Sequence, residues 1–287
     1  MSPTEIAGLI IAAAAGGAIN AVAGGGTLIT FSTLLFFNTP PTIANATSTF
    51  ALVVGTSGSL FGYRGHVQAV RPWLSRFVPI SIAGGLIGGV LLTHTSDRTF
   101  SKLVPFLILF ATILFLAQGL FRRRTLWLPE SRSATVLGRS NVQTASPAED
   151  SKSSVSMGIT SGNPSHRAIW AAILFQFAVA IYGGYFGAGI GILMLASLGF
   201  IGLANIYQMN TLKTILAALI NLAATLWFIF AGLIDWPKAV IMTVGALAGY
   251  YLGAHYSQQI PQKRVRQLIT AIGFILSAIT FYQQFLR

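Results

Sequence analysis

The sequence predicts an all-α, polytopic membrane protein built from two related repeats. Hydrophobic residues make up 54% of the 287 residues and charged residues only 8%. The apolar residues fall in runs of about 20, the length of helix that crosses a hydrocarbon core about 30 Å thick. A pattern of glycines and polar residues in the first half also returns 165 residues later. Because backbone groups in lipid must bond within their own segment, helices are the expected spanning elements.

Each half contains five apolar segments, separated by a hydrophilic stretch. The segments are residues 5–23, 26–37, 43–62, 73–93 and 103–121, then 167–187, 189–202, 206–232, 239–256 and 266–285. The stretch between the halves is rich in Ser, Thr, Arg and Pro and has almost no apolar periodicity, which predicts a flexible linker. We therefore expect a first transmembrane repeat at residues 1–121, a linker at 122–166 and a second repeat at 167–287.

A glycine break separates the first two segments of each half. Three consecutive glycines, Gly24, Gly25 and Gly26, would each cost roughly 1 kcal/mol relative to Ala inside a helix. The second copy contains Gly189 and Gly191, at matching positions. Each pair of segments is therefore predicted to form a glycine-broken helical hairpin, complete or re-entrant.

The odd number of segments predicts that the two repeats are inverted, because each half then starts on the opposite side of the membrane. Loop charges favour the same topology. With five segments per half, three basic clusters fall on one side, which the positive-inside tendency makes cytoplasmic. The clusters are Arg64, Arg71 and Arg76; Arg122, Arg123 and Arg124; and Lys263, Arg264 and Arg266. The linker is then expected to be cytoplasmic and both termini external.

A string of polar residues opens the helix that follows each break. Its members are Asn45, Thr47, Ser48 and Thr49 in the first half and Asn210, Thr211, Lys213 and Thr214 in the second. These side chains could simply cap the helix or bond to the carbonyl four residues earlier. The same Asn at the same distance from each break favours a further role, in which the two copies face each other across a pseudo-two-fold axis.

Lys213 is the one basic residue well inside an apolar segment, one helical turn after Asn210. An ionisable residue within a membrane is by default functional, although a lysine two turns from a helix start could also extend to the interface. The glycine breaks could serve only to pack the hairpins. Alternatively, they expose backbone N–H groups and the positive end of the helix that follows, which together favour binding of an anion. One fixed cation with two helix N-termini would suit a small anion, held where the two breaks converge near the bilayer centre.

Other classes of function find little support. No acidic residue lies in the middle of a segment, which argues against a pathway for metal cations; the six are Glu5, Asp97, Glu130, Glu149, Asp150 and Asp235. The +12 charge lies in short loops and does not indicate nucleic-acid binding. His94 and His255, at matching helix ends, favour packing over catalysis. Because the sequence has no cysteine and no metalloprotease, hydrolase or phosphate-loop motif, we expect neither an enzyme nor a cofactor.

At these motifs the chain resembles the sulfite exporter TauE/SafE family of bacterial membrane permeases. The similar stretches are AGGGTLITFSTLLF and ANATSTFALVVGTSGSLFGY in the first half, and GAGIGILM, QMNTLKTILAALIN and AGLIDW in the second. The resemblance implies secondary transport of small anions, mostly sulfite or organosulfonates, through a duplicated helical fold in the inner membrane. Small carboxylates, other inorganic anions and a non-transporting scaffold remain alternatives.

Overall fold

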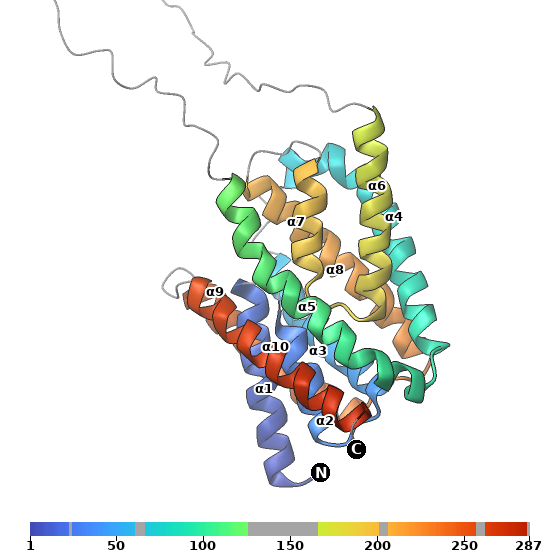
Figure 1. Ribbon diagram of the computed structural model, residues 1–287, viewed down its shortest axis with the longest axis vertical. Helices are drawn as coiled ribbons and strands as arrows, with labels where there is room; N and C mark the ends of the chain where they lie inside the picture. Colours follow the sequence, from blue (N-terminus) through green and yellow to red (C-terminus); the bar gives the residue numbers. More distant parts are fainter. Residues whose placement is uncertain (23–24, 61–66, 126–165, 201–205, 257–261, 286–287) are drawn as a thin grey trace, which may run out of the picture.

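The computed structural model describes residues 1–22, 25–60, 67–125, 166–200, 206–256 and 262–285 (Figure 1). The part of the chain so described forms ten α-helices and contains no strand, which confirms the all-α class. The helices are α1 Pro3–Val22, α2 Gly26–Phe36, α3 Pro41–Leu60, α4 Val67–Thr93, α5 Asp97–Thr125, α6 His166–Tyr185, α7 Ile190–Phe200, α8 Ile206–Phe230, α9 Trp236–Tyr256 and α10 Gln262–Phe285. The predicted linker lies outside the described residues, apart from its ends in α5 and α6.

Three of these helices are long and apolar enough to cross a membrane by themselves. They include residues Pro3–Ala21 of α1, Val70–Thr93 of α4 and Thr211–Phe230 of α8. The described parts of α2 and α6 are apolar but shorter, at Gly26–Phe36 and Ile169–Tyr185. Short apolar helices suit hairpins that are held against longer neighbours.

Two helices end where a residue adopts the left-handed conformation. The residues are Asn38 after α2, with φ 56°, and Gly232 after α8, with φ 68°. In each turn the next N–H bonds back five residues, at 3.0 Å, which satisfies one of the last helix carbonyls. Both helices therefore stop at a defined point, and the chain turns directly into the following helix.

Glycines let α4 pack closely on α6. A Cβ at Gly84 would lie 2.5 Å from the Ala180 Cβ, and one at Gly88 would lie 2.8 Å from the carbonyl carbon of Gly184. Small residues spaced by four are the usual solution for close helix contact in membranes. Because the residue numbers rise together along the contact, α4 and α6 run in the same direction.

The same arrangement joins α9 to α1. A Cβ at Gly245 would lie 2.5 Å from the Ile10 carbonyl oxygen, and one at Gly253 would lie 2.6 Å from the Ala18 Cα. These two helices also run in the same direction. In both contacts the fourth helix of one half packs on the first helix of the other half.

α8 lies along another face of α4. A Cβ at Gly85 would lie 2.7 Å from the Ile220 carbonyl oxygen, and one at Gly89 would lie 3.4 Å from the Ala224 Cα. α8 and α6 are therefore both parallel to α4. Since α6 and α8 point the same way, the short α7 must run back between them, as a hairpin requires.

α3 lies along α9 in the same manner. The Asp235 N–H, at the start of α9, donates to the Thr47 hydroxyl at 3.1 Å, and further along a Cβ at Gly55 would meet the Tyr250 ring at 2.5 Å. α1 and α3 are therefore parallel, with α2 returning between them. If each helix is replaced by its counterpart in the other half, the α1–α9 and α3–α9 contacts become the α6–α4 and α8–α4 contacts, and all four are present. Related repeats would give this exchange, and their inversion across a membrane stays a prediction.

The helices form two groups that mix the halves. α1, α2, α3 and α9 make one group and α4, α6, α7 and α8 the other, and they meet mainly through α3 and α8. One apolar core lies entirely within the second group. α5 and α10 pack on each other and lie across one face of the molecule (Figure 1). α1 begins and α10 ends at the lower end of that view, whereas α5 ends and α6 begins at the upper end, as five segments per half would require.

Candidate functional site at the glycine breaks

At the first break, the described glycines lie where α2 packs on α1. Gly24 lies outside the described residues, and Gly25 precedes α2 with φ −133° and no side-chain cap. Gly26 is buried, and a Cβ there would collide with the Gly16 carbonyl of α1. Gly26 is therefore needed for close contact between α1 and α2.

The second break is a left-handed turn. Gly187 and Gly189 have φ values of 78° and 79°, which glycine adopts at no steric cost and other residues rarely adopt. The Tyr182 hydroxyl donates to the Ala188 carbonyl at 2.8 Å and holds the turn from the side of α6. The chain then enters α7 at Ile190. Glycine is required here for backbone conformation, in contrast to the close packing at Gly26.

Lys213 lies across the start of α7. A Cβ at Gly191 would be 3.4 Å from Lys213 Cδ and 3.9 Å from Lys213 Cε, so the aliphatic chain covers the space that Gly191 leaves free. Lys213 is partly buried and lies about 10 Å along α8 from its first residue. The structure therefore brings together two of the predicted site residues, Lys213 on α8 and Gly191 in the first turn of α7.

No acidic side chain neutralises Lys213 within the described residues. Glu5 and Asp235 both pair with Lys238, at 3.4 and 3.6 Å. Asp97 accepts a hydrogen bond from the Thr42 hydroxyl at 2.5 Å. All three carboxylates lie in the first turn of a helix or just before one, which leaves the positive charge on α8 without a counter-ion in this part of the chain.

Asn45 reaches from the first half to the second break. Its side chain is 1% exposed, and its Nδ2 donates to the Tyr185 carbonyl at the end of α6, at 3.0 Å. Its Oδ1 is buried and has no partner among the described residues. One N–H of this amide is thus engaged, and its oxygen is a buried acceptor without a partner among the described residues.

The three hydroxyls that follow Asn45 bond within the protein. Thr47 receives the Asp235 N–H, Ser48 lies 2.6 Å from Thr30 Oγ1, and Thr49 donates to the Asn45 carbonyl one turn earlier at 2.8 Å. Thr30 also donates to the Gly26 carbonyl at 3.2 Å, so Ser48 is tied to the start of α2. Ser48 and Lys213 thus occupy matching positions beside the half-helices that follow the two breaks.

The remaining predicted residues are placed less completely. Thr214 is partly buried in α8, and the side chain of Asn210 lies outside the described part of that helix. The two breaks are linked through Phe31 of α2 and Phe186, whose ring centroids are 5.4 Å apart at 89°. That the breaks form one substrate site stays a prediction.

Sequence reasoning missed Asn221 of α8. Its Oδ1 is buried without a partner and lies 3.6 Å from the position of a Cβ at Gly187. A signal was present in the sequence, because Asn221 follows Asn210 by three helical turns on the same face. Polar residues repeated along one face of an apolar helix indicate that this face lies toward the interior of the bundle, whereas a helix cap needs a polar residue only at the start.

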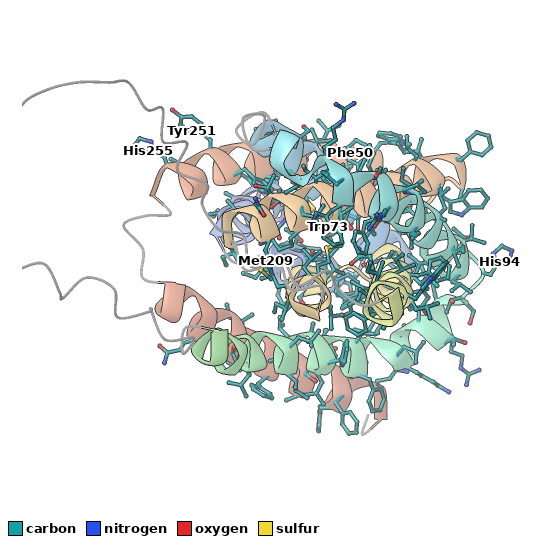
Figure 2. All side chains as sticks on the ribbon, turned by 90° about the horizontal axis from the view of Figure 1, so that it is seen from above. Phe50, Trp73, His94, Met209, Tyr251 and His255 are labelled. Carbon is teal, nitrogen blue, oxygen red and sulfur yellow. The ribbon has the colours of Figure 1, made fainter. Side chains whose placement is uncertain are left out.

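Of the side chains labelled in Figure 2, Met209 lies in the interior, and His94 and His255 lie on the surface. Met209, at the start of α8, points into the bundle, where it packs against the second core. His94 and His255 lie on opposite edges of the molecule and point away from it. Both are exposed. The matching histidines therefore do not form a shared site.

A groove of about 440 Å³ between α5 and α10 is unsuited to an anion. It is lined by Leu109, Phe274, Ser277, Ala278, Phe281 and Tyr282. Several of these side chains are exposed on the outer surface. Such an apolar, open groove fits lipid chains, so the second break remains the candidate site.

Comparison with known proteins decides the class. The sulfite exporter TauE/SafE family profile matches residues 9–280, nearly the whole chain. The chain belongs to this family. A relative from Haemophilus influenzae, described as a probable membrane transporter protein, is 28% identical over 270 residues, covering 93% of this chain and 90% of its own length.

Two further relatives carry similar descriptions. The probable membrane transporter protein YfcA of Escherichia coli K12 is 22% identical over 98% of this chain and 91% of its own length. The probable membrane transporter protein ORF9 of a Sinorhizobium species is 23% identical over 95% and 90%. No solved structure matches the chain. This TauE/SafE protein is thus a multi-pass protein of a membrane transporter family, not of an enzyme family, which confirms the class predicted from the sequence.

Proposed function

We propose that the protein is a secondary transporter of small anions, foremost sulfite or organosulfonates, in the bacterial inner membrane. The observation that carries the proposal is the position of Lys213 across the first turn of α7. A cation without a described counter-ion, next to the positive end of a helix, is a site that an anion would complete. The family description supports sulfur oxoanions as the substrate class.

Two features of the start of α7 favour anion binding. The first N–H groups of a helix have no partner within the helix, and the N-terminus carries about half a positive charge. Gly191 leaves the backbone uncovered except by the Lys213 chain, so an anion could reach both the N–H groups and the ammonium. A unit charge at 4 Å from the ammonium would gain roughly 4 kcal/mol at an effective dielectric constant of 20.

The two helix groups support alternating access. Each group contains one fourth helix from the other half, and the groups meet mainly at α3 and α8. Rocking of one group against the other about this contact would open the second break to either side. α5 and α10, which pack chiefly on each other, would span both groups during that motion.

Binding can be tested by thermal unfolding of the purified protein with candidate anions. A ligand that binds the folded state must raise its apparent stability. We expect sulfite, thiosulfate or small sulfonates to stabilise the wild type more than carboxylates of equal charge do. Lys213→Met should lose the effect and Lys213→Arg should retain part of it, whereas Lys102→Met, at an exposed lysine of α5, should bind as the wild type does. Stabilisation by carboxylates alone would favour the alternative substrate, and no stabilisation by any anion would favour a scaffold.

A further inference from the structure

We propose that the C-terminal end of α6 binds a monovalent cation, with sodium as the ion, beside the anion site at the start of α7. This inference deepens the proposed function by naming a coupling ion. The second break has two unlike ends. α7 begins at its positive end, where the Ile192 N–H already bonds to the Gly189 carbonyl at 3.0 Å. α6 ends at its carbonyls, of which Tyr182 and Tyr185 already accept hydrogen bonds. The negative end of a helix and unwound carbonyls are the groups that hold sodium in transporters with broken helices.

Two side chains with a buried, unpartnered amide oxygen lie at this end of α6. Asn45 Nδ2 donates to the Tyr185 carbonyl, so the orientation of that amide is set and its Oδ1 is left as a bare acceptor. Asn221 Oδ1, from α8, lies 3.6 Å from the Cβ position of Gly187 and is also unpartnered. A buried acceptor without a donor costs about 1–3 kcal/mol. An anion would add to this cost, whereas a cation would remove it.

Further oxygens lie nearby on the same elements. The Gly187 N–H bonds to the Tyr182 carbonyl at 3.3 Å, so the Gly183 carbonyl does not receive the N–H that a continued helix would supply. Thr225 is one turn beyond Asn221 on α8, is 3% exposed, and has an unpartnered buried hydroxyl oxygen. Neutral carbonyl, amide and hydroxyl oxygens suit a singly charged hard cation, which explains how a cation could be held without a carboxylate.

The placement also couples the two ions. Lys213 precedes Asn221 by about two turns of α8, or ~12 Å. A sodium ion at the Asn221 end and the ammonium at the Lys213 end would repel each other, and an anion between them would relieve the repulsion. Each ion should therefore strengthen binding of the other, as symport requires.

Thermal unfolding of the full-length protein without substrate tests the sodium site. Sodium chloride is compared with choline chloride at equal ionic strength, so that chloride stays constant. We expect a saturable rise in Tm of about 5 °C with sodium. Asn221→Leu should abolish the rise, and Asn221→Asp should lower the half-saturating sodium concentration about tenfold. Gln176→Leu removes another buried unpartnered amide oxygen, elsewhere on α6, and should keep the sodium response of the wild type.

Equal Tm values in sodium and choline, or an unchanged sodium response in Asn221→Leu, would overturn the proposal. The same oxygens could instead receive an ammonium group carried by the substrate. Methanesulfonate and aminomethanesulfonate, compared in choline chloride, distinguish this source: stabilisation by the amino compound alone, with no effect of sodium, would also overturn it. Because sodium binding is measured without a sulfur anion and at constant chloride, failure of the anion screen and failure of the sodium site are separate results.

Discussion

The contact between α4 and α6 provides a sharp test of the fold, because two neighbouring glycines of α4 differ in their surroundings. A Cβ at Gly88 would collide with the Ile181 carbonyl and lie 2.7 Å from the Tyr185 nitrogen. Both neighbours are backbone atoms, so a whole helix would have to move. A Cβ at Gly89 would lie 3.4 Å from the nearest atom, at Ala224, which is ordinary van der Waals contact.

Gly88→Ala should therefore destabilise the protein and Gly89→Ala should not. Forcing extra volume into a packed contact costs about 1–3 kcal/mol. At 2–4 °C per kcal/mol for a chain above 150 residues, this predicts a fall in Tm of about 2–12 °C for Gly88→Ala. Gly89→Ala should stay within about 2 °C of the wild type, since alanine is also the better helix former. The assay is thermal unfolding of the purified variants in one detergent, and equal Tm values for the pair would refute the packing.

Two other matched pairs test the breaks and the polar string. Gly189→Ala should lower the free energy of unfolding by about 1–2 kcal/mol because a φ of 79° is strained for alanine. Gly191→Ala should fold normally but weaken anion binding, because its methyl group would lie against the Lys213 chain. Thermal unfolding with and without anion separates the two effects. Thr47→Val should cost about 1–3 kcal/mol because it leaves the backbone N–H that starts α9 unpaired, whereas Thr49→Val should be nearly neutral because that hydroxyl bonds only to its own helix. Similar unfolding midpoints for the two threonine variants would contradict the assignment of Thr47.

Helix positions were predictable because long apolar runs and glycine breaks leave few alternatives in a membrane. α4 and α5 were underestimated: both extend into sequence with charged residues and prolines, such as Arg71 and Pro72, which lower the local hydropathy without ending the helix. Pro72 and Pro79 lie inside α4 and Pro105 inside α5, beyond the first four N–H groups of each helix, so each removes one backbone hydrogen bond without ending the helix.

The site could be predicted only in part. Lys213 stands out as a charge in an apolar run, and its repeat position places it near the second break. The partner of Asn45 could not be found in this way, because Tyr185 is 140 residues away in the other half and carbonyls leave no mark in a sequence. That this bond engages the amide nitrogen and leaves the amide oxygen buried without a partner follows only from three-dimensional structure.

Anion flux in proteoliposomes tests the central claim most directly. Uptake of radiolabelled sulfite should be saturable in the wild type and in Lys102→Met, and should fall to the level of empty liposomes in Lys213→Met. Lys213→Arg should retain measurable uptake if the positive charge beside α7 is what the anion requires. Equal sulfite uptake by wild type and Lys213→Met, at equal amounts of folded protein, would contradict the account.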